Sequence, residues 1–258
     1  MKNLYICRTD WGNPGDLWST PLHYLSKKFQ GPLCDSKNLR GLHDNFDNIV
    51  IGGGALFTSS KMISILENAL EKISSTNLMI WGVSIDKNLN FKSLWDRAVV
   101  KGTRDWLPDT EFEHYWLPCA SVLHPAIKNN LNHRATKDFL VVDHWKRDII
   151  KFTATHTRAT NNPCTIEDMI ALIADHRYII TSSYHTAYWA TLLNKHVIVV
   201  SKPWQPKFEN FRHPPVLAEE FSWALLDLAK NYPDAYDQCR TANELLINTL
   251  SDYFTLPT

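Results

Sequence analysis

A histidine that follows a run of small hydroxyl side chains is the first candidate for chemistry in this sequence. His185 comes after Ser182, Ser183 and Tyr184, with an apolar run at 178–180 before them and apolar residues at helical spacing after them. These patterns predict a buried strand, a capping loop and a helix. Open α/β sheets bind ligands at the carboxyl ends of their strands, and helix amino ends attract anions. His185 is therefore a candidate acid or base, although a purely structural capping loop would have the same sequence.

Three consecutive glycines form the second candidate site. Gly52, Gly53 and Gly54 follow an apolar run at 49–51, and a helix is predicted over 61–74. Glycines let a ligand approach the backbone closely and leave N–H groups that can hold an anion. The spacing matches neither the dinucleotide-binding fingerprint nor the P-loop. Because a strand leads in and a helix leads out, we interpret the triplet as a ligand-binding loop rather than a flexible turn.

Polar side chains also follow two other predicted strands. Asn13 and Asp16 lie in a turn rich in glycine and proline after the first strand, and a helix is predicted from Leu17 on. Arg104 and Asp105 follow a strand that begins near residue 98. Arginine is well suited to binding an anion. Each aspartate would serve equally as a helix or turn cap, and Arg104 and Asp105 would also suit a structural ion pair.

A long, proline-rich loop is predicted after the strand at 197–200. It interleaves basic and aromatic side chains, namely Lys202, Trp204, Lys207, Phe208, Phe211 and Arg212. On a loop at a strand end, such side chains suit an anionic or saccharide ligand. A solvated surface loop is the alternative interpretation.

The composition excludes several classes of protein. The 258 residues contain 27 Lys and Arg against 27 Asp and Glu, so no net charge favours nucleic acid or an anionic membrane. Apolar runs are too short for a membrane span or a signal peptide, which predicts a cytoplasmic protein. The five cysteines are scattered without CxxC or CxxH spacing, which indicates neither a disulfide scaffold nor a zinc site.

Strands and helices alternate along the chain, which predicts an α/β fold. The polar stretch 129–137 is interpreted as a linker between domains 1–130 and 131–258. We expect two Rossmann-like α/β/α domains that face a cleft. Two amphipathic helices, at 216–230 and 235–254, are predicted to close the chain, with the last helix a candidate to pack on the N-terminal domain.

Five stretches, taken in order, together resemble polysaccharide pyruvyl transferases. Asn13–Asp16 is similar to the family's N-x-G-D element, and residues 49–54 to its strand ending in a glycine triplet. Residues 81–84 and 102–105 fall where the family has a G-V-S/G segment and an R-D pair. Residues 183–187 occupy the place of its R-L-H-G-A element. Each stretch is weak evidence alone, and their shared order carries the resemblance over most of the chain.

The resemblance implies a GT-B-like fold and transfer of a pyruvyl group from phosphoenolpyruvate to two hydroxyls of one sugar of a surface polysaccharide or its precursor. His185 is the implied general acid, and Asp16 the base or hydroxyl-binding group on the acceptor side. No metal or other cofactor is expected. The partners are phosphoenolpyruvate and a saccharide, free or linked to a lipid or nucleotide, and not a nucleic acid. The implied substrate-binding residues are Asn13, Gly52, Gly53, Gly54, Arg104, Ser183, Tyr184, Lys202, Lys207 and Arg212.

The chain departs from the family pattern where the donor is bound. Ser183, Tyr184 and Thr186 stand where the family has arginine, leucine and glycine. That arginine is thought to hold the donor's phosphate or carboxylate, so another cation would have to replace it. Two other functions stay open: a glycosyltransferase of the same architecture that uses a nucleotide sugar, and an inactive relative that binds sugar or phosphate.

Overall fold

The structure is a computed structural model that describes residues 1–9, 12–39, 41–42, 44–145, 150–162, 164–202 and 206–253. Its internal contacts divide the chain into two compact units. Unit 1 contains Met1–Asp10, Asp16–Ser121 and Thr241–Thr258, and unit 2 contains Trp11–Gly15 and Val122–Arg240. The segment predicted as a linker, 129–137, holds the end of a helix and the turn before a strand. The domain boundaries near residue 130 stay a prediction.

Unit 1 is built on a six-stranded sheet in which every neighbouring pair is parallel. Its strands lie in the order β2 (Leu33–Asp35), β1 (Asn3–Cys7), β3 (Phe46–Gly52), β4 (Ser75–Val83), β5 (Ala98–Thr103) and β6 (Tyr115–Trp116). The chain adds β2 on one side of β1 and then β3 to β6 on the other. This reversal makes a topological switch point between β1 and β3, where open α/β sheets bind their ligands.

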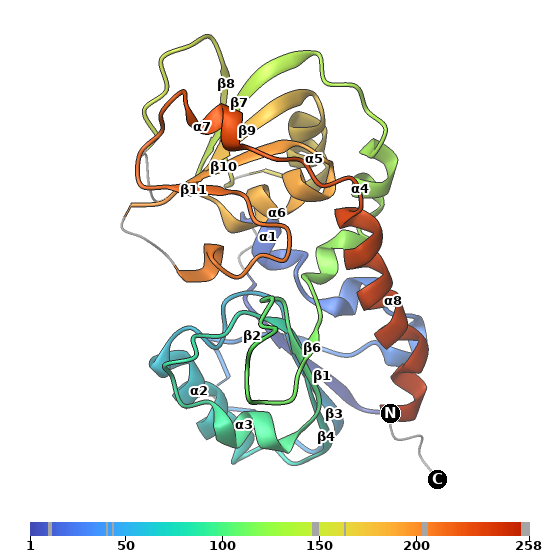
Figure 1. The fold of residues 1–258 in the computed structure, drawn as a ribbon. Helices are drawn as coiled ribbons and strands as arrows, with labels where there is room; N and C mark the ends of the chain where they lie inside the picture. Colours follow the sequence, from blue (N-terminus) through green and yellow to red (C-terminus); the bar gives the residue numbers. More distant parts are fainter. Residues whose placement is uncertain are drawn as a thin grey trace. The chain divides into compact units, whose positions relative to one another are not determined.

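Alternate residues of the unit 1 strands point to opposite faces of the sheet. Leu4 and Ile6 pack with the helices α2 (Ser60–Leu70) and α3 (Lys92–Arg97), which lie together beside the sheet in Figure 1. Tyr5 belongs to the core on the other face. That core also receives residues of the short turns η1 (Pro21–Tyr24) and η2 (Lys27–Phe29) and of the later turns of α8 (Ala235–Tyr253), while the one-turn helix α1 (Pro14–Leu17) precedes η1.

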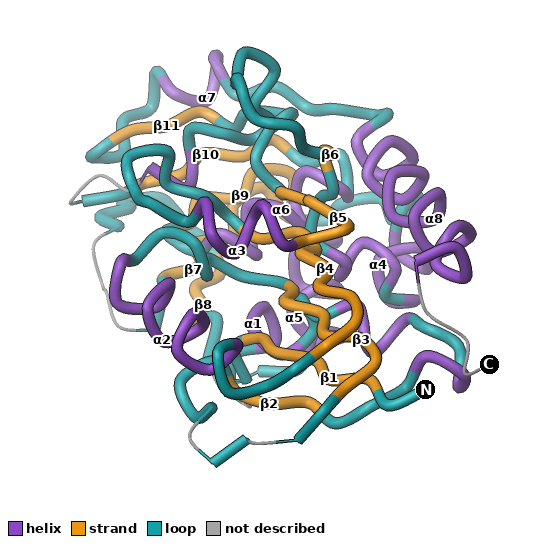
Figure 2. The backbone as a smooth tube through the Cα atoms, turned by 90° about the horizontal axis from the view of Figure 1, so that it is seen from below, coloured by secondary structure: helices purple, strands orange, loops and turns teal. Residues whose placement is uncertain are grey.

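Unit 2 repeats the same topology with five parallel strands, orange in Figure 2. They lie in the order β11 (Val216–Ala218), β10 (His196–Val200), β9 (His176–Thr181), β7 (Lys137–Asp143) and β8 (Thr157–Thr160). The second strand again lies on the opposite side of the first from the later ones. The switch point of unit 2 is therefore between β7 and β9, and the stretch with His185 follows β9.

Two helices of unit 2 have termini that the sequence marks: Thr165 with Asp168 matches a capping box at the start of one, and Asn194 is the predicted end of the other. The helices of this unit are α4 (Pro125–Asn130), α5 (Ile166–Ala174), α6 (Tyr184–Leu192) and α7 (Leu225–Leu228), with the short turns η3 (Ala120–Leu123) before α4 and η4 (Pro206–Phe208) after β10. The Thr165 hydroxyl accepts a hydrogen bond from the Asp168 N–H at 3.0 Å, which confirms the predicted cap of α5. Asn194, just past α6, has a φ of 56°, the left-handed conformation that helix ends favour.

Three sequence predictions about local structure are wrong. The helix predicted at 216–230 is the edge strand β11 followed by the short α7, because Val216–Ala218 pairs with β10. Residues 156–163 carry no strand pattern and are predicted from the sequence as a loop, but they contain β8, which pairs with β7. The helix predicted from Leu17 on is interrupted, because Pro21 has no N–H with which to continue it.

The two parallel sheets confirm the predicted α/β class with two Rossmann-like units. That these units face one another across a cleft stays a prediction. Within the residues that the structure describes, no helix combines the length and the apolar character needed to cross a membrane.

A buried histidine makes the stability of the fold depend on pH. Both ring nitrogens of the buried His176 are engaged, with Nδ1 2.7 Å from the Leu172 carbonyl oxygen and Nε2 2.9 Å from the Thr157 hydroxyl. Burial lowers the His176 pKa from its ordinary value of 6.5. Below that value the unfolded chain binds more protons than the folded chain, so folding is favoured less.

We therefore expect the contribution of His176 to stability to be complete above its unfolded pKa of 6.5 and to fall as the pH drops below it. Urea midpoints at about pH 7.5 and about pH 5.5 measure the change. A His176→Asn variant should lose less stability between these values than the wild type. If the two proteins lost the same amount, His176 would not be the group that titrates.

Candidate functional site

The carboxyl ends of β7 and β9 are joined by a network of buried hydroxyl groups. The Thr181 hydroxyl donates to the Val142 carbonyl at 2.7 Å and accepts the Ser183 N–H at 3.0 Å. The Ser182 hydroxyl accepts the His144 N–H at 2.8 Å. All three hydroxyl residues are buried. They hold the turn before α6 against the end of β7, directly at the switch point of unit 2.

The turn leads into the amino end of α6, where His185 lies in the first turn. Ser183 is the N-cap residue of α6, yet its hydroxyl makes no capping hydrogen bond to the helix. The helix dipole at this end favours a negative charge. His185 itself is buried, and its ring lies 5.8 Å from that of Trp189 and 5.4 Å from that of Tyr184.

The backbone of Gly15 lies directly against the His185 imidazole. A Cβ added to Gly15 would lie 2.7 Å from the His185 Cβ and closer still to the ring atoms Cγ and Nδ1. The Asn13 carboxamide oxygen accepts the Gly15 N–H at 3.2 Å and the Asn161 amide at 3.5 Å. Asn161 follows β8, so the turn that contains Asn13 and Gly15 is attached to the same sheet edge as His185. Two stretches 170 positions apart in sequence therefore meet within unit 2.

The basic loop after β10 reaches the same helix end through aromatic packing. The Tyr184 ring lies 4.8 Å from the Phe211 ring and 6.3 Å from the Phe208 ring. This packing brings the loop to the first turn of α6, and Lys207 and Arg212 are the sequence neighbours of those phenylalanines. Lys202 instead forms an exposed ion pair with Glu220 at 2.8 Å, and Trp204 lies outside the described residues.

In unit 1 the glycine triplet lies at the end of β3, beside the switch point. Gly53 and Gly54 both have a φ of 82°. The Gly53 N–H donates to the Trp81 carbonyl at 2.9 Å, and the Gly54 carbonyl accepts the Ser84 N–H at 2.9 Å. The Gly53 amide is therefore committed to the fold rather than to an anion.

Of the neighbours Arg104 and Asp105, Asp105 has a structural role and Arg104 is the candidate for ligand binding. Asp105 accepts hydrogen bonds from the Ser84 hydroxyl at 2.9 Å and from the Ile85 N–H at 2.7 Å. Burial raises the Asp105 pKa, and the charge of Arg104 opposes this. Asp105 therefore holds the loop after β4, about 20 residues before it in sequence, which is a structural role that the local sequence pattern does not specify. Arg104 is buried at the same edge.

The charges of Asp16 and Arg104, both in unit 1, each affect the pKa of the buried Cys119 thiol. Burial raises the Cys119 pKa, hydrogen bonds with Ser121 and the charge of Arg104 lower it, and Asp16 raises it. The structure thus gathers Asp16, Gly52 and Arg104 at one sheet edge in unit 1. It gathers Asn13, Ser183, Tyr184, His185, Lys207 and Arg212 at the corresponding edge of unit 2. That Asp16 and His185 share one site stays a prediction.

Two polar residues at the sheet edges, Asp35 and Asn161, were not predicted from the sequence. Asp35, at the end of β2, accepts hydrogen bonds from the Thr9 N–H and hydroxyl, both at 2.9 Å, from the Lys37 N–H at 2.7 Å and from Arg8. Burial raises the Asp35 pKa, but these hydrogen bonds and Arg8 hold it below its ordinary value. In dinucleotide-binding Rossmann folds an acidic side chain near this strand binds the ribose of the cofactor. The Asp35 carboxylate instead accepts hydrogen bonds from the protein itself. Asn161 is the other group, and no local pattern marks it.

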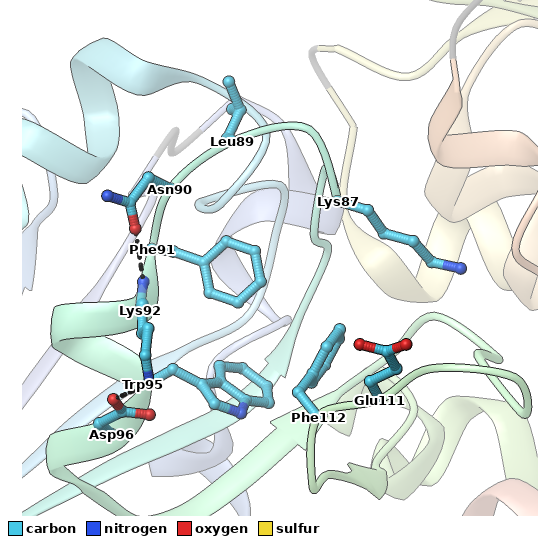
Figure 3. A pocket seen from close by; sticks show the side chains of 9 residues that line it. All are labelled: Lys87, Leu89, Asn90, Phe91, Lys92, Trp95, Asp96, Glu111 and Phe112. Carbon is cyan, nitrogen blue, oxygen red and sulfur yellow. Dashed lines mark hydrogen bonds and ion pairs between the residues drawn. The ribbon is translucent and has the colours of Figure 1, made fainter.

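A separate cavity of about 360 Å³ lies in unit 1 between α3 and the loops after β4 and β5. Figure 3 shows the rings of Phe91, Trp95 and Phe112 along its floor, with Lys92 paired to Asp96 on its rim. Since the charges on this rim offset each other, the cavity offers no concentrated positive charge to a phosphate. In the described part of the chain, no group of three or more His, Cys, Asp or Glu side chains is placed to hold a metal.

No protein-family model and no curated protein matches the chain significantly. Among solved structures, an uncharacterized protein from Klebsiella pneumoniae is 13% identical with a TM-score of 0.54, over 84% of this chain and 92% of the other. A weaker similarity is to the ADP-heptose lipopolysaccharide heptosyltransferase II of E. coli, which is 12% identical with a TM-score of 0.38, over 95% of this chain and 99% of the other. Another is to an alpha-glucosyltransferase in complex with UDP and DNA, which is 9% identical with a TM-score of 0.44, over 98% of this chain and 92% of the other.

The Klebsiella structure shows a shared fold and nothing about activity. Both weaker neighbours are glycosyltransferases by name, and similarity of this degree does not bear on the reaction of this chain. The fold and the two sheet edges define a two-unit, Rossmann-type α/β protein with a candidate anion site at α6.

Proposed function

We propose that this chain is a transferase that forms a pyruvate ketal on a saccharide, with phosphoenolpyruvate as the donor. The observation that carries the proposal is the packing of Gly15 on His185. It joins the stretch that resembles the N-x-G-D element to the stretch that resembles R-L-H-G-A, at the switch point of a parallel sheet. Two separate motifs of one family thus meet at the edge where such sheets bind ligands.

The donor's negative charges would be bound by the amino end of α6 together with Lys207 and Arg212. These two cations would take the place of the family arginine, where this chain has Ser183. Lys202 is a weaker candidate because Glu220 already pairs with it. Hydrogen-bond donors and a helix dipole fixed in advance stabilise a leaving phosphate without reorganisation.

The reaction needs a proton at one carbon and two deprotonated hydroxyls. His185 would donate a proton to the methylene carbon of phosphoenolpyruvate, which becomes a methyl group and leaves a cation-like centre at the neighbouring carbon. One sugar hydroxyl attacks that centre and loses its proton, with Asp16 the candidate acceptor. The second hydroxyl then closes the ring as phosphate leaves with the electron pair of its C–O bond; the proton of that hydroxyl returns to the His185 imidazole, and the proton taken up by Asp16 leaves with the phosphate. Proton transfer of this kind contributes about 10²–10⁴ in rate.

Glycosyl transfer from a nucleotide sugar is the rival function, and the serine at position 183 favours it. A thermal-shift panel of phosphoenolpyruvate, nucleoside diphosphates and their sugars separates the two. A ligand at about 100 times its dissociation constant stabilises the folded state by about 2.7 kcal/mol. Stabilisation by phosphoenolpyruvate supports the proposal, whereas stabilisation by one nucleotide alone would replace it with glycosyl transfer.

We expect His185→Ala to retain the stabilisation by phosphoenolpyruvate but to lose release of phosphate from it in the presence of acceptor. The reason is that the helix end and the basic loop bind the donor, while His185 supplies the proton. A colorimetric phosphate assay measures the loss, expected to be about 10²-fold or more. Undiminished release from the variant would remove His185 from the mechanism.

A further inference from the structure

Trp145 places a half-exposed indole two residues beyond the end of β7, next to the switch point of unit 2. Its side chain is 45% exposed. Among the described residues, Trp223 and Trp106 are also exposed to a similar degree: Trp223 packs on the Phe139 and Phe152 rings, and Trp106 lies edge-on against Trp116. The Trp145 ring lies beside that of His144, with the two planes only 17° apart and the centroids 6.3 Å apart. The two residues thus present nearly parallel rings.

Buried polar side chains hold the backbone beneath these rings. The His144 N–H donates to the Ser182 hydroxyl at 2.8 Å, and the Trp145 N–H donates to the Asn161 carboxamide oxygen at 2.9 Å. Asn161 also donates to Asn13, which accepts the Gly15 N–H beside His185. A short series of hydrogen bonds therefore connects the exposed indole to the candidate acid.

The carboxylate before this platform is neutralised. Asp143, the last residue of β7, is buried and forms an ion pair with Arg158 at 2.6 Å. An uncharged ring that lies on an indole face gains apolar contact and needs no charged partner. The exposed indole beside the candidate acid therefore suits an uncharged ring.

We propose that Trp145, with His144, is the stacking platform for a hexopyranose ring of the acceptor saccharide. This inference rests on the proposed function, in which the donor's anionic groups occupy the end of α6. Phosphoenolpyruvate has no ring, so the acceptor is the substrate that uses an aromatic platform. The apolar face of the sugar would lie on the indole, with its hydroxyls directed towards His185.

The test measures binding of the methyl glycosides of glucose, galactose and mannose by saturation-transfer NMR. We expect Trp145→Ala to weaken binding of at least one glycoside about tenfold, equivalent to about 1.4 kcal/mol, and Trp145→Phe to retain most of it. Trp106→Ala, at a half-exposed tryptophan of unit 1, should leave the affinity unchanged. Since the Trp145 side chain is exposed, the alanine variant should keep the thermal midpoint of the wild type.

Several results would overturn the assignment. One is equal glycoside affinity in the wild type and Trp145→Ala, and another is no saturation transfer to any of the three glycosides. Loss of uridine diphosphate binding in Trp145→Ala, with glycosides unaffected, would make the platform a nucleobase site instead. Stabilisation by phosphoenolpyruvate is measured separately on each variant, so failure of the sugar platform is distinguishable from failure of the proposed donor.

Discussion

Replacing Gly15 by alanine is expected to displace the His185 imidazole from its place at the amino end of α6. The added methyl group would overlap the ring atoms Cγ and Nδ1 of His185. The ring has little room to move, because Tyr184 and Trp189 lie against it. Overpacking of a filled site costs about 1–3 kcal/mol. Urea unfolding measures this cost, and the histidine ring resonances in an NMR spectrum report the displacement.

Gly12→Ala is the matched control in the same turn. The three atoms nearest to a Cβ on Gly12 would all belong to the side-chain amide of Asn162, with Oδ1 the closest of them. The end of a flexible side chain can give way, so this variant should lose less stability and leave the His185 resonances in place. An unchanged His185 spectrum in Gly15→Ala would show that the glycine does not pack on the ring. If the proposed function holds, Gly15→Ala should also lose the catalytic effect of His185.

Replacing Gly53 by alanine is expected to cost the most stability of any single change in the glycine triplet. Its φ of 82° is left-handed, which costs an alanine about 1–2 kcal/mol. In addition, the new Cβ would lie 2.5 Å from the backbone carbonyl oxygen of Ser19. Backbone cannot rotate away as a side chain can, so a further ~1–3 kcal/mol is expected. Urea unfolding gives the total.

Gly54→Ala separates these two costs. Gly54 has the same φ of 82°, but a Cβ there would meet no atom within 4 Å. It should therefore lose only the conformational part. Equal losses in the two variants would mean that Ser19 moves aside without cost. Because the Ser19 hydroxyl donates to the Asp16 carbonyl at 2.9 Å, Gly53→Ala is also expected to disturb the candidate acceptor-side group.

The strands of both sheets were predictable where their residues are buried on both faces. The runs at 49–51, 139–142 and 197–200 are continuous and apolar, as central parallel strands require, and each lies in a strand of the structure. Edge strands carry no such pattern. β8 consists of the partly exposed TRAT and β11 of VLA, so pairing with a neighbour and not composition defines them.

Residue type and local order alone identified the groups able to do chemistry: a histidine at a strand-to-helix turn, a glycine triplet after a strand, and a basic loop after another. Their allocation between the units depended on tertiary contacts. Gly15 joins unit 2 while Asp16 joins unit 1, and Lys202 is paired with Glu220 while Lys207 and Arg212 are carried to Tyr184. A one-dimensional pattern specifies burial and local conformation, whereas partners distant in sequence are chosen by strand order and close packing, which no short window of residues contains.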